Sequence, residues 1–546
     1  MEMHFATVWE AIADNIGDKT ALVHGDARYT WTEYDTNAAR IATALTEAGL
    51  KPDSKTALYL YNSPEYLTAQ FGTFKTSGVP INVNYRYLDD ELHYILDNAD
   101  AEALFFHDAL ADRVARLLEH KPIPLKLLVQ VPDIPGTPLQ NPLPQAIPYS
   151  DLLANHDPAP RITRSEDEIY MLYTGGTTGM PKGVMYNMGA FCRANTTGLH
   201  ALLGLSVSNV KEVGKAATDI HARGEGMVSI PACPLMHGTG MWLGAMMPHG
   251  TGGTVVTLPN RSFDPDELWQ TMEREKATFL VIVGDAFAKP LLRALEAAKA
   301  QGKPYDLSSV KGMMSSGVMW TKEVKKGLLE HGDFMITDAM GATEGGMGIQ
   351  ITTRYNVDSE TAKFALMDTA KVFTEDGREV VPGSGEIGLV ASGANPPLGY
   401  WKDPEKSALT FKTINGKRYS FPGDWGTIEA DGTLVLLGRG SQCINTGGEK
   451  VYPEEVEEAI KRHTSVRDCL VVGLPDEKFG NRVTALASLN PNTQATPDEI
   501  RSVLDGALAR YKHPKNIHIV KQVHRTAQGK ADYPWATKTA AELELS

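Results

Sequence analysis

The stretch from Tyr173 to Tyr186, YTGGTTGMPKGVMY, carries residue types that bind phosphate. Its glycines let a loop turn backbone N–H groups inward, and a concave row of N–H groups binds phosphate oxygens. Thr174, Thr177 and Thr178 add hydroxyl donors, and Lys182 adds a positive charge. A flexible surface turn is the alternative for such a cluster. A Walker A loop is excluded because it needs a serine or threonine after the lysine, where this chain has glycine.

Five more residues have side chains suited to chemistry on phosphates and carboxylates: His237, Thr343, Glu344, Asp424 and Lys530. A carboxylate can hold a divalent cation or accept hydrogen bonds from hydroxyl groups. A lysine on a loop can bridge two anions. Each residue also has a plainer interpretation: a buried, hydrogen-bonded histidine, a solvated or turn-forming carboxylate, or an exposed lysine near the C-terminus. Sequence context has to decide among these readings.

The length and composition of the chain limit the number of domains and the kinds of partner. With 546 residues the chain exceeds one ordinary core, so we expect at least two domains, and its 42% hydrophobic content supplies those cores. The net charge of -14 argues against nucleic acid as a partner, because such proteins present a basic face. An anionic small-molecule substrate stays open, since a few cations in a cleft dominate at short range.

Cysteine usage and hydropathy indicate the compartment. The four cysteines lie far apart with no C-x-x-C pair, which favours reduced thiols in a cytoplasmic protein over a disulfide scaffold or a structural zinc site. The N-terminus lacks the pattern of a signal peptide, and no stretch has 18 uninterrupted apolar residues. We therefore expect no transmembrane segment. Peripheral membrane association and homo-oligomerisation stay open.

The first half of the chain alternates between helical and strand-like patterns. Apolar spacing predicts helices over 34–50, 64–75 and 89–98, the first ending at a glycine, and a buried strand over 55–61. The apolar run SGVPINVN, residues 77–84, is interpreted as a turn. This alternation predicts a layered α/β architecture.

The second half of the chain contains a β-rich region followed by a mixed helical and strand region. Asp-Gly pairs at 376–377 and 431–432 predict hairpin turns, so the region 372–439 is expected to be β-rich. Beyond it, the pattern predicts helices over 454–462 and 497–511 and strands over 469–475 and 516–523. The fold class predicted is therefore α/β, with a large multi-layer N-terminal domain containing a β-rich subdomain, followed by a small α+β C-terminal domain.

Six ordered segments resemble the adenylate-forming superfamily, which includes acyl-CoA synthetases, nonribosomal adenylation domains and luciferases. They are YTGGTTGMPKG from 173, PLMHGTG from 234, GATEG from 341, the glycine and charged pairs 423–424, 431–432 and 438–439, GGEKVYPEEVE from 447, and RTAQGK from 525. The order of these motifs and their span of essentially the whole chain make coincidence untenable.

That resemblance implies the first half of a two-step reaction, in which a carboxylate attacks the α-phosphate of ATP and expels pyrophosphate. Thr343 would donate to the α-phosphate, Glu344 would hold Mg²⁺, and Lys530 would bridge the acid and the α-phosphate as the catalytic lysine. His237 would lie beside the acyl carbonyl as a third catalytic residue, and Asp424 would bind the ribose. The implied ATP-binding residues are Thr174, Gly175, Gly176, Thr177, Thr178, Gly179, Lys182, Gly317, Gly341, Ala342, Thr343, Glu344, Asp424, Arg439 and Lys530.

The resemblance also implies a second half-reaction, in which a thiol, coenzyme A, attacks the acyl-adenylate. In the family the small C-terminal domain swings between the two steps about a hinge. Here the resemblance assigns the N-terminal domain to 1–438, the hinge to 439–444 with Gly440 and Ser441, and the mobile C-terminal domain to 445–546. Gly447 and Gly448 would shape the channel for the CoA arm.

The substrate is expected to be a small-molecule carboxylic acid. The stretch INTGGEKVYPEEVE is similar to ligases of long fatty acids and steroid side-chain acids. Small residues at the expected acyl entrance leave room for a large substrate. They are Gly238, Thr239, Gly240, Ser316 and Gly345.

The sequence is compatible with four alternative functions. The enzyme could load a carrier protein in place of CoA, or it could act on a medium-chain or aryl acid. A luciferase-like oxygenase shares the first half-reaction. A catalytically inactive nucleotide-binding module is the alternative outside enzymes, and retention of Thr343, Glu344, Asp424 and Lys530 argues against it.

Overall fold

The computed structural model describes most of the chain. The residues described are 3–120, 123–174, 180–317, 320–357, 361–439, 442, 444–446, 449–476, 480–505, 507–508, 510–526 and 530–545. By contact density the chain divides into two compact units. Unit 1 comprises Met1–Gly345, Gln350–Ser359 and Ala394–Ser420; unit 2 comprises Gly346–Ile349, Glu360–Gly393 and Phe421–Ser546.

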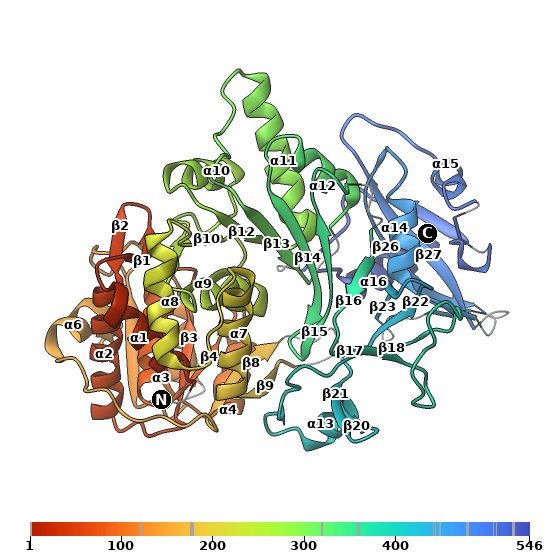
Figure 1. Cartoon of the computed structure of the whole chain (residues 1–546). Coiled ribbons are helices and arrows are strands. Elements are labelled where there is room, and N and C mark those ends of the chain that lie inside the picture. The colour runs from red at the N-terminus through yellow and green to blue at the C-terminus, as the bar shows by residue number, and fades with distance from the viewer. Residues whose placement is uncertain are drawn as a thin grey trace. The chain divides into compact units, whose positions relative to one another are not determined.

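Unit 1 contains a five-stranded parallel sheet covered by helices (Figure 1). Its strand order is β4-β3-β5-β6-β7. The strands are β3 Lys55–Tyr59, β4 Val79–Asn82, β5 Ala101–His107, β6 Leu127–Val131 and β7 Ile147–Pro148. The helices between and around them are α2 Trp31–Glu47, α3 Pro64–Lys75, α4 Asp89–Asn98, α5 Ala111–His120 and α6 Tyr149–Asn155.

A second sheet of unit 1 has the order β2-β1-β11-β10-β12-β13-β14, with every pair parallel except β1–β2. Its strands are β1 Thr20–His24, β2 Ala27–Thr30, β10 Val228–Pro231, β11 Thr254–Thr257, β12 Phe279–Ile282, β13 Gly312–Ser316 and β14 Met335–Ala342. Its helices are α1 Phe5–Ile16, α7 Met188–Leu202, α8 Val210–Ala222, a π-helix Thr239–Met246, α9 Met247–His249, α10 Pro265–Arg274, α11 Gly284–Ala300 and α12 Lys322–Leu329.

Smaller strands complete unit 1. A three-stranded antiparallel sheet has the order β19-β9-β8. Its members are β8 Ile169–Thr174, β9 Lys182–Asn187 and β19 Gly399–Tyr400. The chain then continues through α13 Pro404–Thr410 into the hairpin β20 Phe411–Ile414 and β21 Lys417–Ser420.

Unit 2 contains an antiparallel sheet and a C-terminal α+β portion. Residues 348–349 of β15 (Gly345–Thr352) pair with the antiparallel sheet. Its other strands are β16 Lys363–Leu366, β17 Ala370–Phe373, β18 Gly388–Ser392, β22 Asp424–Ile428 and β23 Thr433–Arg439. The C-terminal portion holds β24 Ile444–Thr446, β25 Glu449–Val451, α14 Pro453–Ile460, β26 Val466–Asp476, β27 Gly480–Leu489, α15 Pro497–Ser502, β28 Asn516–Ile519 and α16 Tyr533–Leu545. Helices α14 and α16 pack on β26.

Local signals explain several boundaries. Helix α2 begins with a capping box: Glu33 N donates to Thr30 Oγ1 at 3.2 Å, and Thr30 N donates to Glu33 Oε2 at 2.8 Å. After its last turn Gly49 has a φ of 82°, the left-handed conformation that glycine adopts at a helix end. Helix α4 has the predicted bounds, and Asp431-Gly432 turns β22 into β23 as predicted.

Two predictions about local structure are wrong. Residues 79–82 within the expected turn form strand β4, which pairs with β3 at the edge of its sheet. An edge strand tolerates Pro80 because, within the described part of the chain, one side of its backbone has no partner strand. The helix expected over 497–511 ends at Ser502. Gly506 follows four residues later, and glycine is a poor helix former.

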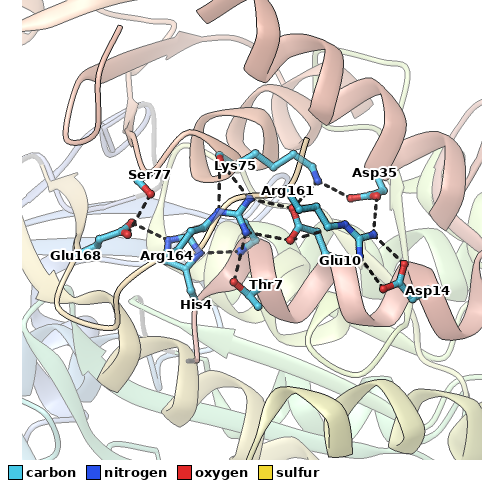
Figure 2. Close-up of polar contacts among 11 residues, drawn as sticks. His4, Thr7, Glu10, Asp14, Asp35, Lys75, Ser77, Arg161, Arg164 and Glu168 are labelled. Atoms are coloured by element: carbon cyan, nitrogen blue, oxygen red, sulfur yellow. Dashed lines mark hydrogen bonds and ion pairs between the residues drawn. The ribbon is translucent and has the colours of Figure 1, made fainter. Parts of the chain in front are cut away.

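A buried ion-pair network joins α1, α3 and the segment that leads into β8 (Figure 2). Glu10 accepts from Lys75 Nζ at 2.8 Å and from the Arg164 guanidinium at 2.9 and 3.0 Å. These three side chains are at most 5% exposed. Lys75 also lies 2.6 Å from Asp35, at the rim of the network. We call Glu10, Lys75, Arg164 and Asp35 the Glu10 network.

Candidate active site

The hairpin of β8 and β9 positions the two ends of the glycine-rich segment. Thr174, the last residue of β8, is the cross-strand partner of Lys182, the first residue of β9. Tyr94 on α4 donates a hydrogen bond to the carbonyl of Pro181 at 3.2 Å. Five residues predicted to bind phosphate lie between these ends and outside the described residues: Gly175, Gly176, Thr177, Thr178 and Gly179.

The short strand β19 brings a distant part of the chain to Lys182. Tyr400 is paired with Val184 on β9, and Trp401 N donates to Gly183 O at 2.8 Å. Asp403 therefore reaches Lys182, with 2.9 Å between Oδ2 and Nζ. The hydrogen bond from Lys182 holds the pKa of Asp403 below its ordinary value. About a third of each side chain is exposed, so water reaches this ion pair.

The chain segment after β14 lies against the same residues. Thr343 and Glu344 follow the end of this strand at Ala342. Tyr186 Oη donates to Thr343 O at 2.6 Å, and Tyr400 Oη donates to Glu344 Oε1 at 2.6 Å. Ser420 Oγ donates to the carbonyl of Glu344 at 2.8 Å. The backbone at Thr343 and Glu344 is thus fixed by hydroxyl groups from other strands.

Tyr400 connects the two charged groups. Its ring lies 5.6 Å from Lys182 Nζ, and its hydroxyl contacts Glu344. Burial, and then the negative charge of Glu344, raise the pKa of Tyr400, so the phenol keeps its proton and acts as the donor. We call Lys182, Glu344, Tyr400 and Asp403 the Lys182–Glu344 cluster. It places a cation and a carboxylate next to the end of the glycine-rich segment.

Asn82, which the sequence analysis did not single out, links this hairpin to the histidine segment. Its amide nitrogen donates to Tyr173 O at 2.8 Å and to Met236 O at 2.6 Å, and its oxygen accepts from Tyr173 N at 2.7 Å. The side chain is 8% exposed. The one sequence signal that could have identified Asn82 is its polar side chain within the apolar run 77–84, because a buried polar group needs hydrogen-bond partners.

The residues near the expected acyl entrance lie at strand ends and in one turn. His237 starts the turn into the π-helix, where Met241 N donates to its carbonyl at 2.9 Å. Gly240 is buried, and a Cβ there would lie 2.3 Å from Pro234 O, so packing alone requires glycine. A Cβ on Gly238 would lie 3.2 Å from the Trp242 ring. The contribution of Gly238, Thr239 and Gly240 to an acyl pocket stays a prediction.

Other predicted residues of unit 1 lie at the ends of neighbouring strands. Ser316 ends β13, and Gly317 after it has a φ of 89° with open space where a Cβ would be. Gly341 and Ala342 end the adjacent β14, and Gly345 starts β15 with a φ of 150°. Because β13 and β14 are parallel neighbours, these residues share one sheet edge.

Unit 2 carries the rest of the predicted site. Asp424, 8% exposed, is the cross-strand partner of Arg439 on β22 and β23. Gly438 has a φ of 127°, a conformation that favours glycine, and a Cβ there would also displace the Glu454 side chain, whose Oε2 lies 2.3 Å away. Lys530 is exposed. Four predicted hinge and channel residues lie outside the described residues: Gly440, Ser441, Gly447 and Gly448.

A family model described as AMP-binding enzyme matches residues 9–401, and one described as AMP-binding enzyme C-terminal domain matches 455–530. The chain is 39% identical to the 3-oxocholest-4-en-26-oate–CoA ligase of Rhodococcus rhodochrous, with 98% of this chain and 96% of the relative covered. It is 38% identical to the medium/long-chain-fatty-acid–CoA/3-oxocholest-4-en-26-oate–CoA ligase of Mycolicibacterium smegmatis, with 99% and 97% covered.

Solved structures share the fold. The anthranilate CoA ligase AuaEII in complex with anthranoyl-AMP matches with a TM-score of 0.82 at 23% identity, covering 99% of this chain and 98% of that one. ATP-bound MatB from Rhodopseudomonas palustris matches with a TM-score of 0.79 at 24% identity, covering 100% of both chains. These similarities confirm the predicted fold class.

The fold and the matches define an enzyme that adenylates a carboxylic acid with ATP and joins it to a thiol. The chain belongs to the AMP-binding enzyme family. The predicted resemblance is therefore confirmed, as is the prediction of an AMP-forming acid–CoA ligase with ATP and CoA as substrates. In the part of the chain that the structure describes, no helix is long and apolar enough to cross a membrane.

Proposed function

We propose that this chain forms an acyl-adenylate from ATP and a long-chain or steroid side-chain acid, and then an acyl-CoA thioester. The observation that carries the residue assignments is the Lys182–Glu344 cluster, in which a cation and a carboxylate lie at the end of the glycine-rich segment. The names of the relatives at 39% and 38% identity support the acid class.

In the first half-reaction an oxygen of the substrate carboxylate forms a bond to the α-phosphorus, the bond between the α-phosphorus and the α,β-bridging oxygen breaks, and pyrophosphate leaves. Lys182 would exchange Asp403 for phosphate oxygens, which the water-accessible ion pair permits. Thr343 would donate to the α-phosphate from a backbone that Tyr186 fixes. Lys530 would stabilise the negative charge that gathers in the transition state.

Glu344 fits a role in holding Mg²⁺. Mg²⁺ in such sites takes one or two carboxylates together with substrate phosphates, and Tyr400 orients the Glu344 carboxylate through its Oε1. When bound, Mg²⁺ would neutralise the pyrophosphate as it leaves.

In the second half-reaction the thiol sulfur of CoA attacks the acyl carbonyl carbon, AMP leaves, and the thiol proton passes to solvent. We propose that 1–438 and 445–546 act as separate domains for the two steps, with 439–444 as the hinge. Asp424 and Arg439, which are cross-strand partners, would hold the ribose. His237 would lie beside the acyl carbonyl, and Gly447 and Gly448 would line the CoA channel.

The test is a panel of acids assayed for CoA-dependent release of AMP from ATP. Hexanoate, dodecanoate, octadecanoate, benzoate and 3-oxocholest-4-en-26-oate separate short, long, aryl and steroid substrates. We expect octadecanoate or the steroid acid to give the highest kcat/KM. Fastest turnover of benzoate would overturn the acid class, and absence of AMP with every acid would overturn the activity.

A further inference from the structure

Lys530 lies in a turn whose two ends are joined. Arg525 and Ala531 form an antiparallel bridge. Inside it, Thr526 N donates to Lys530 O at 2.8 Å, and Lys530 N donates to Thr526 Oγ1 at 3.2 Å. The backbone of Lys530 is therefore set by the base of this turn, while its side chain is exposed. We call the described residues 525, 526, 530 and 531 the lysine turn.

The upstream end of the lysine turn is attached to β26 by a bidentate ion pair. Arg525 Nε donates to Asp468 Oδ2 at 2.7 Å, and Nη2 donates to Oδ1 at 2.6 Å. Two parallel bonds fix the orientation of a guanidinium as well as its position. Asp468 lies at an irregularity in the pairing of β26 with β27, and Cys469 N donates to its Oδ1 at 2.9 Å.

Both side chains of this ion pair are ionised at neutral pH. The two side chains are 24% and 23% exposed. Burial alone would raise the pKa of Asp468, but the hydrogen bonds and charge of Arg525 outweigh it and hold that pKa below its ordinary value. Both partners are therefore charged at neutral pH, and the hydrogen bonds are charge-assisted.

The downstream end of the lysine turn is attached separately. Asp532 caps α16 by accepting from Trp535 N at 3.0 Å, and the Trp535 ring stacks on His524 at 4.4 Å between centroids. Near this end α16 packs on β26 through Ala536 and Ala540, and only its far end carries Glu544, the ion-pair partner of Arg482 on β27. Loss of Arg525 would thus free one end of the turn and leave α16 in place.

We infer that Arg525 is a positioning residue for Lys530, and that its bidentate pair with Asp468 holds the lysine turn in the geometry that the adenylation step needs. The inference rests on the proposed role of Lys530. A shift of about 1 Å in a catalytic group costs on the order of 100-fold in rate. Thioester formation, in which Lys530 has no proposed part, should not depend on Arg525.

The test compares Arg525→Met with Arg482→Met. Both variants remove one arginine from a partly buried ion pair of the C-terminal portion, where the side chains are 24% and 27% exposed. Acid-dependent exchange of pyrophosphate into ATP reports adenylation. Conversion of a synthetic acyl-adenylate and CoA into thioester reports the second step. The acid is the one that turns over fastest in the panel.

We expect Arg525→Met to lower the exchange rate at least tenfold and to change thioester formation less than twofold. Arg482→Met should leave the ratio of the two rates at its wild-type value. Equal loss of both rates in Arg525→Met, or the same ratio as in Arg482→Met, would overturn the inference. Asp468→Asn, which keeps the shape of the side chain, gives the same comparison if Arg525→Met does not fold.

Lys530→Ala separates this inference from the proposed function. If Lys530→Ala abolishes exchange while Arg525→Met behaves like Arg482→Met, the inference about Arg525 fails and the role of Lys530 stands. If Lys530→Ala leaves exchange intact, the proposed role of the lysine fails, and the inference fails with it.

Discussion

The Glu10 network and the Lys182–Glu344 cluster are built from the same kinds of groups and differ in their access to water. In the first, Glu10, Lys75 and Arg164 are at most 5% exposed, and Asp35 at the rim supplies the second carboxylate that balances the two cations (Figure 2). In the second, the Lys182–Asp403 pair is about one-third exposed, and a tyrosine hydroxyl contacts the neighbouring carboxylate. Buried pairs cannot exchange partners without leaving charge in an apolar interior. The exposed cluster can, so it suits a ligand site.

The largest effect is expected from breaking the buried network. Glu10→Gln leaves Lys75 and Arg164 without the carboxylate between them, and loss of one partner of a buried ion pair costs about 3–5 kcal/mol. The free energy of unfolding, from urea denaturation at pH 7, should fall by that amount. AMP release per folded molecule should stay at the wild-type value.

Asp219→Asn is the matched control, because it makes the same carboxylate-to-amide change in an exposed pair with Lys215. Its expected cost is below about 1 kcal/mol. Equal destabilisation by the two variants would show that burial does not distinguish the network. The pKa of Glu10 is a second check: burial raises it, Lys75 and Arg164 outweigh burial, and the net pKa is lowered. The stabilisation by Glu10 should therefore be present above pH 4.5 and disappear as the pH falls below it.

The opposite pattern is expected for the cluster. Glu344→Gln should lower AMP formation by about 10²–10³-fold, the size typical of a lost electrostatic contact in a transition state. It should change the free energy of unfolding by less than about 1 kcal/mol, because Glu344 is only half-buried and a glutamine oxygen can still accept from Tyr400. Steady-state AMP release and urea denaturation on the same preparation measure both quantities. A loss of stability as large as that of Glu10→Gln would contradict the distinction between the two regions.

Sequence alone predicted the parts of the fold that depend on local signals. The bounds of α4 follow from its apolar spacing, and the turn at Asp431-Gly432 follows from the preference of that pair for hairpins. Strand β4 was missed because Pro80 favours a turn locally, and only the neighbouring strand shows that it is an edge. The chain beyond Ser502 was misread because the apolar spacing of the sequence continues past the residue at which the helix ends.

The site shows the same limit. A hairpin around the glycine-rich segment makes Thr174 and Lys182 neighbours, and the segment itself points to phosphate. Asp403, however, is 221 residues from Lys182, and the strand that brings it there has two residues, too few for any periodicity. Tyr400 was missed for the same reason. Contacts that depend on sheet assembly leave no local pattern.

Glu457 in unit 2 is buried like Glu10, but it accepts hydrogen bonds from neutral groups. Val471 N and Tyr533 Oη donate to its Oε1 at 2.9 and 3.1 Å. Burial, and then the charge of Glu454, raise the pKa of Glu457 to about 8. Glu10, surrounded by cations, shifts in the other direction.

The folded state therefore holds a proton at Glu457 that the unfolded state releases above pH 4.5. Its contribution is fully present below that pH and is lost as the pH rises through about 8, by at most about 1.4 kcal/mol per pH unit. Glu457→Gln should remove this slope. Urea denaturation from pH 5 to 8.5, with hydrogen exchange of β26 peptides as the local probe, measures it. Parallel pH profiles for wild type and variant would show that Glu457 titrates normally.

The smallest effect is expected from the tyrosine that joins the two halves of the cluster. Tyr400→Phe removes the hydroxyl that orients Glu344, and loss of a hydrogen bond to a metal-binding carboxylate costs about tenfold in metal affinity. The Mg²⁺ concentration that half-saturates ATP binding, measured by calorimetry, should rise by that factor. Tyr305→Phe is the control, because Tyr305 also donates to a carboxylate, Asp266, at 2.8 Å. If the hydroxyl only stabilised the fold, both variants would lose stability and neither would need more Mg²⁺. A higher Mg²⁺ requirement in Tyr400→Phe alone would show that the Lys182–Glu344 cluster tunes ligand binding.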